Sequence, residues 1–428
     1  MPGMIFRRTF RLTFVVLLLV ILLNASDFAI FDPSQRVREF TRALEFDYVN
    51  WTLQALVTKL SQGALSASRY LPEAAQKQVV LDYLDLVRQM QSAEASLNQI
   101  YSDPNVVDKE STSLELRQQI QRFHRRSDLL EPLAEEILEN QVSQIAAELG
   151  LALGGQILPP VLYHTTQPPD ALIVSPRDTI RQEANISLTP ELSVDQFQEL
   201  EEKVDAALDV SSLVVGIGGV GLYPTMVMRT TDPNWLAEVV AHEWIHNYLT
   251  LRPLGITYAN NPELRTMNET VAAIAGKEIG RAVIERFYPQ FLPPPPSEAT
   301  PTPESAPESE AESEPPSPPP FDFLKEMRET RVNVDRLLAD GKIEQAETYM
   351  ELRRRFLWDN GYQIRKLNQA YFAFHGAYAD QPGGAAGDDP VGEAVRALRV
   401  QSTSLADFLD RIAWMWSFDQ LKSAVGQE

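Results

Sequence analysis

The chain has 428 residues, of which 44% are hydrophobic, and it carries a formal net charge of −21 at pH 7. This length is sufficient for two or three domains with a sizeable core. The acidic balance argues against nucleic acid as a partner, because phosphates would be repelled. The sequence contains no cysteine, which excludes disulfides, thiolate metal ligands and a cysteine nucleophile.

The N-terminus has the pattern of a signal sequence or a membrane anchor. Three arginines between residues 7 and 11 precede the apolar run of residues 12–23. Extended to residue 31, the run reaches the roughly 20 residues that a membrane span needs. The residues around Ala25 fit a cleavage site poorly. Residues 1–31 are therefore predicted to be an uncleaved membrane anchor with a cytoplasmic N-terminus, which places the remainder on the extracytoplasmic face. If the signal is cleaved instead, the protein is secreted or periplasmic.

Residues 32–150 are predicted to form a helical domain. Apolar side chains recur at helical spacing among Gln, Glu and Arg in residues 39–59, 72–98 and 111–148. We find no chemical motif in this region, and its partner is unknown.

The composition changes in residues 151–292. Short runs rich in β-branched residues occur at residues 158–164, 170–176 and 184–190, bounded by Pro, Asp and Asn. A helix is expected at residues 194–208 and a further strand at residues 223–229. This pattern predicts a small mixed β-sheet. Asp232, as N-cap, and Pro233 then begin a helix that runs to about residue 252, and the next helix is expected at residues 262–287.

The last third of the chain contains a linker and a second helical region. Residues 293–320 consist only of Pro, Ser, Glu, Thr and Ala, which predicts a disordered linker. Residues 321–428 are predicted to be a helical subdomain that completes the catalytic domain, with helices at residues 321–339, 343–359 and 362–378. The fold class expected is α+β and mainly helical.

One motif in the sequence has the residues of a catalytic metal site. His242, Glu243 and His246 form the pattern HExxH within the helix that begins at Pro233. Residues four apart share a helix face, so both imidazoles can bind one ion, and zinc suits imidazole ligands. Glu243 can act as the general base that takes a proton from the attacking water. The alternative is two ordinary helix histidines beside an incidental glutamate.

The third metal ligand is expected in the next helix. Neither Asp nor His occurs between Asn247 and Phe321, so a glutamate is needed. Glu269 is the best candidate, because Ala273, Gly276 and Gly280 lie on its side of the helix and would permit close packing. The alternative for Glu269 is a carboxylate on the helix surface.

HExxH followed by Asn-Glu in the next helix resembles the gluzincin group of zinc metallopeptidases, the thermolysin and membrane-alanyl aminopeptidase type. The resemblance covers about residues 223–287. It implies a zincin-like catalytic core, flanked here by the two helical regions, with Zn²⁺ bound by His242, His246 and Glu269 and with Glu243 as base. It also implies an edge strand that binds substrate, for which residues 223–229 are the candidate.

The same resemblance implies two supporting roles. A side chain must orient a ligand histidine, and Asn268 or Asn247 is expected to do so. A downstream histidine or tyrosine must stabilise the oxyanion. His375 is the preferred candidate for that catalytic role, followed by Tyr371, with Asn368 and Tyr378 on the same predicted helical stripe. The alternative for the stripe is a packing face.

Two functional hypotheses follow. The first is a membrane-anchored, extracytoplasmic zinc metallopeptidase that hydrolyses a peptide or protein substrate. The second is a non-catalytic envelope or interaction protein that retains a zincin fold. The intact His242, Glu243 and His246 favour the first.

Overall fold

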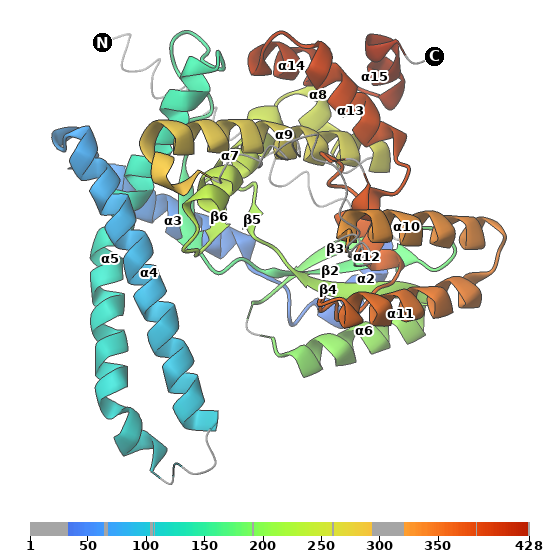
Figure 1. The fold of residues 1–428 in the computed structure, drawn as a ribbon, viewed down its shortest axis with the longest axis horizontal. Helices are drawn as coiled ribbons and strands as arrows, with labels where there is room; N and C mark the ends of the chain where they lie inside the picture. Colours follow the sequence, from blue (N-terminus) through green and yellow to red (C-terminus); the bar gives the residue numbers. More distant parts are fainter. Residues whose placement is uncertain are drawn as a thin grey trace, which may run out of the picture.

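The structure is a computed structural model that describes residues 33–63, 67–102, 106, 108–190, 192–258, 261–292, 321–381 and 383–426. In these residues the protein is mainly helical, with two three-stranded sheets (Figure 1). The α+β, mainly helical class is therefore confirmed, whereas two sheets replace the one that the sequence predicts. The predicted anchor at residues 1–31 and the predicted linker at residues 293–320 lie outside the described residues.

The N-terminal part of the chain is helical. Its two longest helices, α4 and α5, form an antiparallel pair that extends away from the rest of the molecule (Figure 1). Asp108 caps α5 by accepting a hydrogen bond from the backbone N–H of Ser111 at 3.0 Å. The elements are α2 (Pro33–Thr41), α3 (Tyr48–Gly63), the 3₁₀ turn η1 (Ala67–Tyr70), α4 (Glu73–Ser102) and α5 (Lys109–Glu148).

The antiparallel sheet has the order β3-β2-β4 and is covered on both faces. Alternate side chains of β2 point to opposite sides, as the pleat requires. Leu172 and Val174 pack with α2 and α6, whereas Ala171 and Ile173 pack with α12. The elements are β2 (Asp170–Pro176), β3 (Ala184–Leu188), α6 (Val194–Leu208), β4 (Val210–Gly216) and α12 (Gln369–His375).

The second sheet is mixed and has the order β1-β6-β5. Its strands are β1 (Tyr163–Thr166), β5 (Gly219–Val220) and β6 (Thr225–Met228). β6 is parallel to β1 and antiparallel to β5, so it is the central strand. A strand does lie within residues 223–229, but the prediction that it is an edge strand that binds substrate is wrong, because both edges of β6 are already paired. The exposed edge next to the HExxH helix belongs to β5.

The helix that contains the HExxH motif, α7 (Pro233–Leu249), packs along α9 (Pro262–Phe287) over much of its length. Asp232 caps α7 by accepting from the N–H of Asn234 at 2.9 Å, and Pro233 is its first residue, as predicted. Glycines make the close contact possible. A Cβ on Gly276 would lie 2.9 Å from the Cβ of His242, and one on Gly280 would lie 2.7 Å from the backbone of Glu238. The small-residue side of α9 that the sequence predicts is thus confirmed.

The C-terminal helices complete the molecule. α13 and α15 pack against α9, and α10 packs against α11 (Figure 1). One hydrophobic core joins residues of α4, α5, α7 and α9 to α13, α14 and α15, so it crosses the domain boundary predicted near residue 150. The remaining elements are α8 (Pro253–Ile256), η2 (Pro289–Phe291), α10 (Phe323–Ala339), α11 (Ile343–Asp359), η3 (Gly384–Ala386), α13 (Pro390–Gln401), α14 (Leu405–Ile412) and α15 (Phe418–Val425).

Among the residues that the structure describes, no helix is long and apolar enough to cross a membrane. The predicted membrane anchor and the localisation that was inferred from it are therefore not supported by the structure, and neither is retained. The apolar run at residues 12–31, on which that prediction depended, is not among the described residues.

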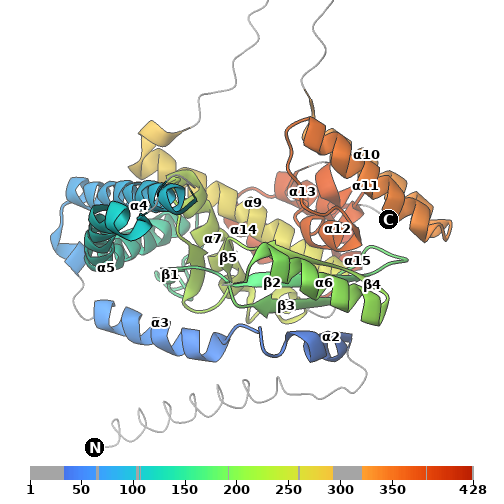
Figure 2. The ribbon, with the colours of Figure 1, turned by 90° about the horizontal axis from the view of Figure 1, so that it is seen from below.

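A buried ion-pair network fastens α3 to α5. The ammonium of Lys59 lies 2.6 Å from Glu135 and 2.8 Å from Glu139. Both carboxylates also accept backbone N–H groups at β1, Glu135 from Thr165 and Glu139 from Tyr163. Figure 2 shows α3 lying along the edge of the molecule, next to α2. Removing one charge from such a network leaves the others buried without compensation, which destabilises a protein strongly.

We expect Lys59→Met to lower the free energy of unfolding by about 3–5 kcal/mol, because two buried carboxylates lose their cation. Urea unfolding followed by circular dichroism measures this loss. Lys203→Met is the matched control, because its ion pair with Glu199 lies on the surface and should contribute little. Equal destabilisation by the two substitutions would contradict the role of Lys59.

Candidate metal centre

The contact between α7 and α9 brings three side chains to one point. The Nε2 atoms of His242 and His246 lie 3.2 Å apart. Each of them lies 3.6 Å from Oε2 of Glu269. The two histidines come from successive turns of α7, and Glu269 faces them from α9. The three residues that the sequence predicts as ligands are thus brought together.

Hydrogen bonds fix the orientation and the tautomer of the His246 ring. Its Nδ1 lies 2.8 Å from Oδ1 of Asn268, whose amide nitrogen donates to the carbonyl of Leu254 at 3.1 Å. Because the amide is oriented by Leu254, Oδ1 must accept, and Nδ1 of His246 carries the proton. Nε2 of the neutral ring then directs a lone pair toward Glu269. Asn268 therefore orients this histidine, whereas Asn247 instead donates to the carbonyl of Leu222 and to Thr225.

The cluster attracts positive charge. Burial opposes protonation of His246, but the charge of Glu269 outweighs it and raises the pKa of His246 to about 9. Burial alone would raise the pKa of Glu269, yet the two histidines hold it well below its usual value. The Oε2 atom of Glu269 is buried and accepts no hydrogen bond. The raised pKa of His246 means that its protonated ring carries the positive charge when no metal ion is bound, and a metal cation would replace that proton among the two imidazole nitrogens and the carboxylate oxygen.

These donors suit zinc. Two nitrogen ligands at ~2.0–2.1 Å from a tetrahedral zinc lie roughly 3.3 Å apart. The 3.2 Å between the two Nε2 atoms matches that spacing. Two imidazoles with one carboxylate, and no thiolate, form a ligand set that leaves a position for water. His242, His246 and Glu269 could therefore hold Zn²⁺.

Glu243 lies beside the cluster, under a glycine-rich turn. It is only 8% exposed, and burial raises its pKa against the opposing charges of His242 and His246. A Cβ on Gly219 would lie 2.8 Å from Oε1 of Glu243, and one on Gly221 would lie 2.8 Å from the Cβ of His246. Only glycine permits this turn to pass so close. The edge of β5 therefore lies directly over the predicted general base.

A cavity of about 350 Å³ surrounds these residues and is lined by several elements. Tyr48, Tyr258 and Tyr378 are among its lining residues, and of these the sequence singled out only Tyr378, on the stripe of His375. The hydroxyl of Tyr258 donates to Oε1 of Glu269 at 2.5 Å. Tyr378 lies with its ring 6.2 Å from that of His242. The desolvation of its hydroxyl and then the charge of Glu269 raise the pKa of Tyr378. The hydroxyl therefore keeps its proton and remains a hydrogen-bond donor.

His375 is not among the residues that line this cavity. Its ring packs 4.3 Å from that of Tyr371 and 5.1 Å from that of Phe374, and burial lowers its pKa to about 4. α12 ends at His375, so Tyr378 lies beyond the helix and not on the predicted stripe. The catalytic role predicted for His375 stays untested, and Tyr378 is the residue of that stretch that reaches the cavity.

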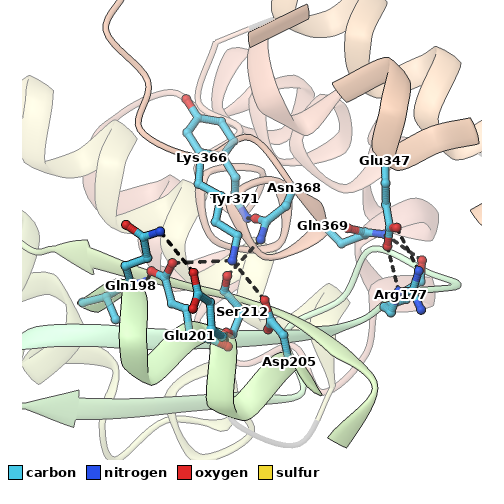
Figure 3. Close-up of polar contacts among 12 residues, drawn as sticks. Arg177, Gln198, Glu201, Asp205, Ser212, Glu347, Lys366, Asn368, Gln369 and Tyr371 are labelled. Carbon is cyan, nitrogen blue, oxygen red and sulfur yellow. Dashed lines mark hydrogen bonds and ion pairs between the residues drawn. The ribbon is translucent and has the colours of Figure 1, made fainter. Parts of the chain in front are cut away.

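Ion pairs hold α12 against the antiparallel sheet. Arg365 and Lys366, just before the helix, bind the buried carboxylate of Glu201 in α6, and Lys366 also lies 3.0 Å from Asp205. Asn368 caps α12 and donates to the carbonyl of Ser212 in β4 at 2.9 Å. Figure 3 shows Lys366 and Asn368 reaching toward Glu201, Asp205 and Ser212. The network fixes the position of α12 and of the turn that carries Tyr378.

A second group of possible ligand atoms consists of Glu131, Glu135 and His164. Its charges are already balanced. Lys59 binds Glu135 at 2.6 Å, and Arg229 lies 3.0 Å from Glu131. His164 directs Nδ1 to Glu135 at 3.1 Å. This group is a structural network that needs no metal.

Comparison of the chain with protein-family models, with curated proteins and with solved structures finds no match.

We expect Asn268→Ala to reduce the affinity for Zn²⁺ by about 10–100-fold, because His246 loses the partner that fixes its ring. Isothermal titration of the metal-free protein with Zn²⁺ measures the change. Asn247→Ala is the matched control, since its amide contacts only Leu222, Thr225 and the backbone of its own helix, and it should leave the affinity nearly unchanged. Equal losses in both variants would contradict a specific role for Asn268.

Proposed function

We propose that this protein is a zinc metallopeptidase of the gluzincin type, with a zincin-like core formed around α7, α9 and the β1-β6-β5 sheet. The observation that carries the proposal is the convergence of His242, His246 and Glu269 on one point beside Glu243. Oε2 of Glu269 is buried without a hydrogen-bond partner there, and the cluster opens into a cavity. The substrate proposed is a peptide or a protein.

When bound, zinc supplies a Lewis acid that lowers the pKa of a water molecule toward ~7. Glu243 would accept a proton from the attacking water, because it adjoins His242 in the sequence and lines the same cavity. Burial raises its pKa, so it is a stronger base than an ordinary glutamate and can pass the proton to the leaving amine. Asn268 keeps His246 in the tautomer that directs Nε2 inward.

Two features of the cavity wall suit a peptide substrate. β5 lies at the edge of its sheet directly above Glu243, and an extended peptide can pair with such an edge through main-chain hydrogen bonds. Tyr378 faces the cluster from the opposite wall, beyond α12. Its hydroxyl stays protonated and donates to the oxyanion that develops on the scissile carbonyl.

Measurements of zinc content and peptide hydrolysis together test the proposal. The purified full chain should contain one zinc ion and hydrolyse an unstructured peptide. Glu243→Gln should keep the zinc and lose about 10²–10⁴-fold in rate, because it removes only the base. Glu269→Gln should lose most of the zinc. Glu263→Gln, an exposed carboxylate at the start of α9, is the matched control and should change neither property.

Three results would decide against this assignment. Full zinc content in Glu269→Gln would exclude Glu269 as a ligand, and full activity in Glu243→Gln would exclude Glu243 as the base. If the unchanged chain binds no zinc, the hypothesis of a non-catalytic interaction protein is the better one.

A separate experiment identifies the oxyanion donor. We expect Tyr378→Phe to lower kcat by about 10²-fold or more without changing the zinc content, because one donor to the transition state is lost. His375→Gln is the comparison, since His375 is packed among aromatic rings outside the cavity lining. Loss of kcat in His375→Gln, with normal kcat in Tyr378→Phe, would reverse the assignment and support the residue preferred from the sequence.

A further inference from the structure

Arg265 occupies a distinctive position in the cleft. It lies on α9 one turn before Glu269 and is only 8% exposed. It lines the cavity of the candidate metal centre and also an adjoining cavity of about 710 Å³. The guanidinium therefore lies where the two cavities meet.

The hydrogen bonds of Arg265 leave its charge without a carboxylate partner. One Nη donates to the carbonyl of Ala373 at 3.2 Å, and the side chain also bonds the hydroxyl of Tyr258. Its Nε atom is buried and has no partner. Among the described residues, no carboxylate lies within 4.0 Å of this guanidinium.

Lys59 shows how this protein otherwise buries a cation. It is also 8% exposed, yet it lies 2.6 Å and 2.8 Å from two carboxylates. A buried charge without such compensation is unfavourable, and guanidinium groups bind carboxylates in a bidentate geometry. Arg265 thus has the chemistry of a ligand-binding cation and not of a structural ion pair.

The route from Arg265 to the metal centre is short. Tyr258 bonds Arg265 on one side and donates to Glu269 on the other. An extended residue spans about 3.3–3.6 Å. A group bound at Arg265 therefore belongs to a residue close to the bond that is cleaved.

We propose that Arg265 binds a carboxylate of the peptide substrate, which makes the protein selective for peptides with a negative charge near the scissile bond. The carboxylate is either the C-terminus of the peptide or an acidic side chain. This inference rests on the proposed peptidase function, and it adds the class of substrate.

Binding without turnover tests the role of Arg265. The full chain with Glu243→Gln is titrated with a fluorescent pentapeptide of neutral side chains, either as the free acid or as the C-terminal amide, and anisotropy is measured. A third peptide is the amide with one glutamate. We expect the parent to bind at least one of the two anionic peptides about 10-fold or more tighter than the neutral amide. Adding Arg265→Gln should bring that ratio close to one.

The three peptides separate the two sources of the carboxylate. Preference for the free acid assigns Arg265 to the C-terminus, and preference for the glutamate peptide assigns it to an acidic side chain. Equal affinity of the parent for all three peptides overturns the proposal. A preference that Arg265→Gln leaves unchanged overturns it as well.

Two controls keep the outcome interpretable. Thermal unfolding and zinc content show whether Arg265→Gln is folded. If it is not, the parent's preference decides the test together with Arg265→Lys, which keeps the charge but not the bidentate geometry and should give an intermediate ratio. The titrations are repeated with metal-free protein, so a chain that proves not to be a zinc peptidase still yields a result for Arg265.

Discussion

The close packing of α7 on α9 is the constraint on which the candidate site depends. Gly276 and Gly280 let the backbones approach until a single added methyl group would collide with His242 or Glu238. At that separation a glutamate is long enough to reach two imidazoles on the facing helix. A larger residue at Gly276 would separate the carboxylate from the histidines, although alanine is otherwise the better helix former. The two glycines therefore lower the helix propensity of α9 but allow the close approach that the site requires.

The opposite wall of the cleft depends on residues far away in the chain. Tyr378 follows α12, and α12 is held by Arg365 and Lys366 on Glu201 and by Asn368 on β4. Neither wall includes the complete site. The metal ligands and the base lie on α7 and α9, whereas the hydroxyl faces them from a segment anchored on the other sheet.

Local signals in the sequence predicted the helices well, including the capped start of α7 and the small-residue side of α9. Glu269 and Asn268 could also be found, because the motif and its spacing limit the choice. Tertiary contacts produced the errors. The helix expected at residues 39–59 is interrupted where Phe46 donates to the carbonyl of Ser187 beside β3. The helix expected from residue 362 begins only after the ion pairs of Arg365 and Lys366. Tyr258 and Arg265 carry no motif, so only the folded chain brings them to the cavity, and Tyr378 was named only as a member of the stripe around His375.

The core around α9 has a consequence for the order of folding. α9 is covered by α5, which precedes it in the sequence, and by α13 and α15, which follow it at a long sequence distance. During synthesis, the side of α9 that α13 and α15 cover stays exposed to water until those two helices have also left the ribosome. Contacts between such distant segments slow folding and favour association of incomplete chains. Removal of α13 and α15 should therefore expose that side of α9 permanently and lower the solubility of the protein.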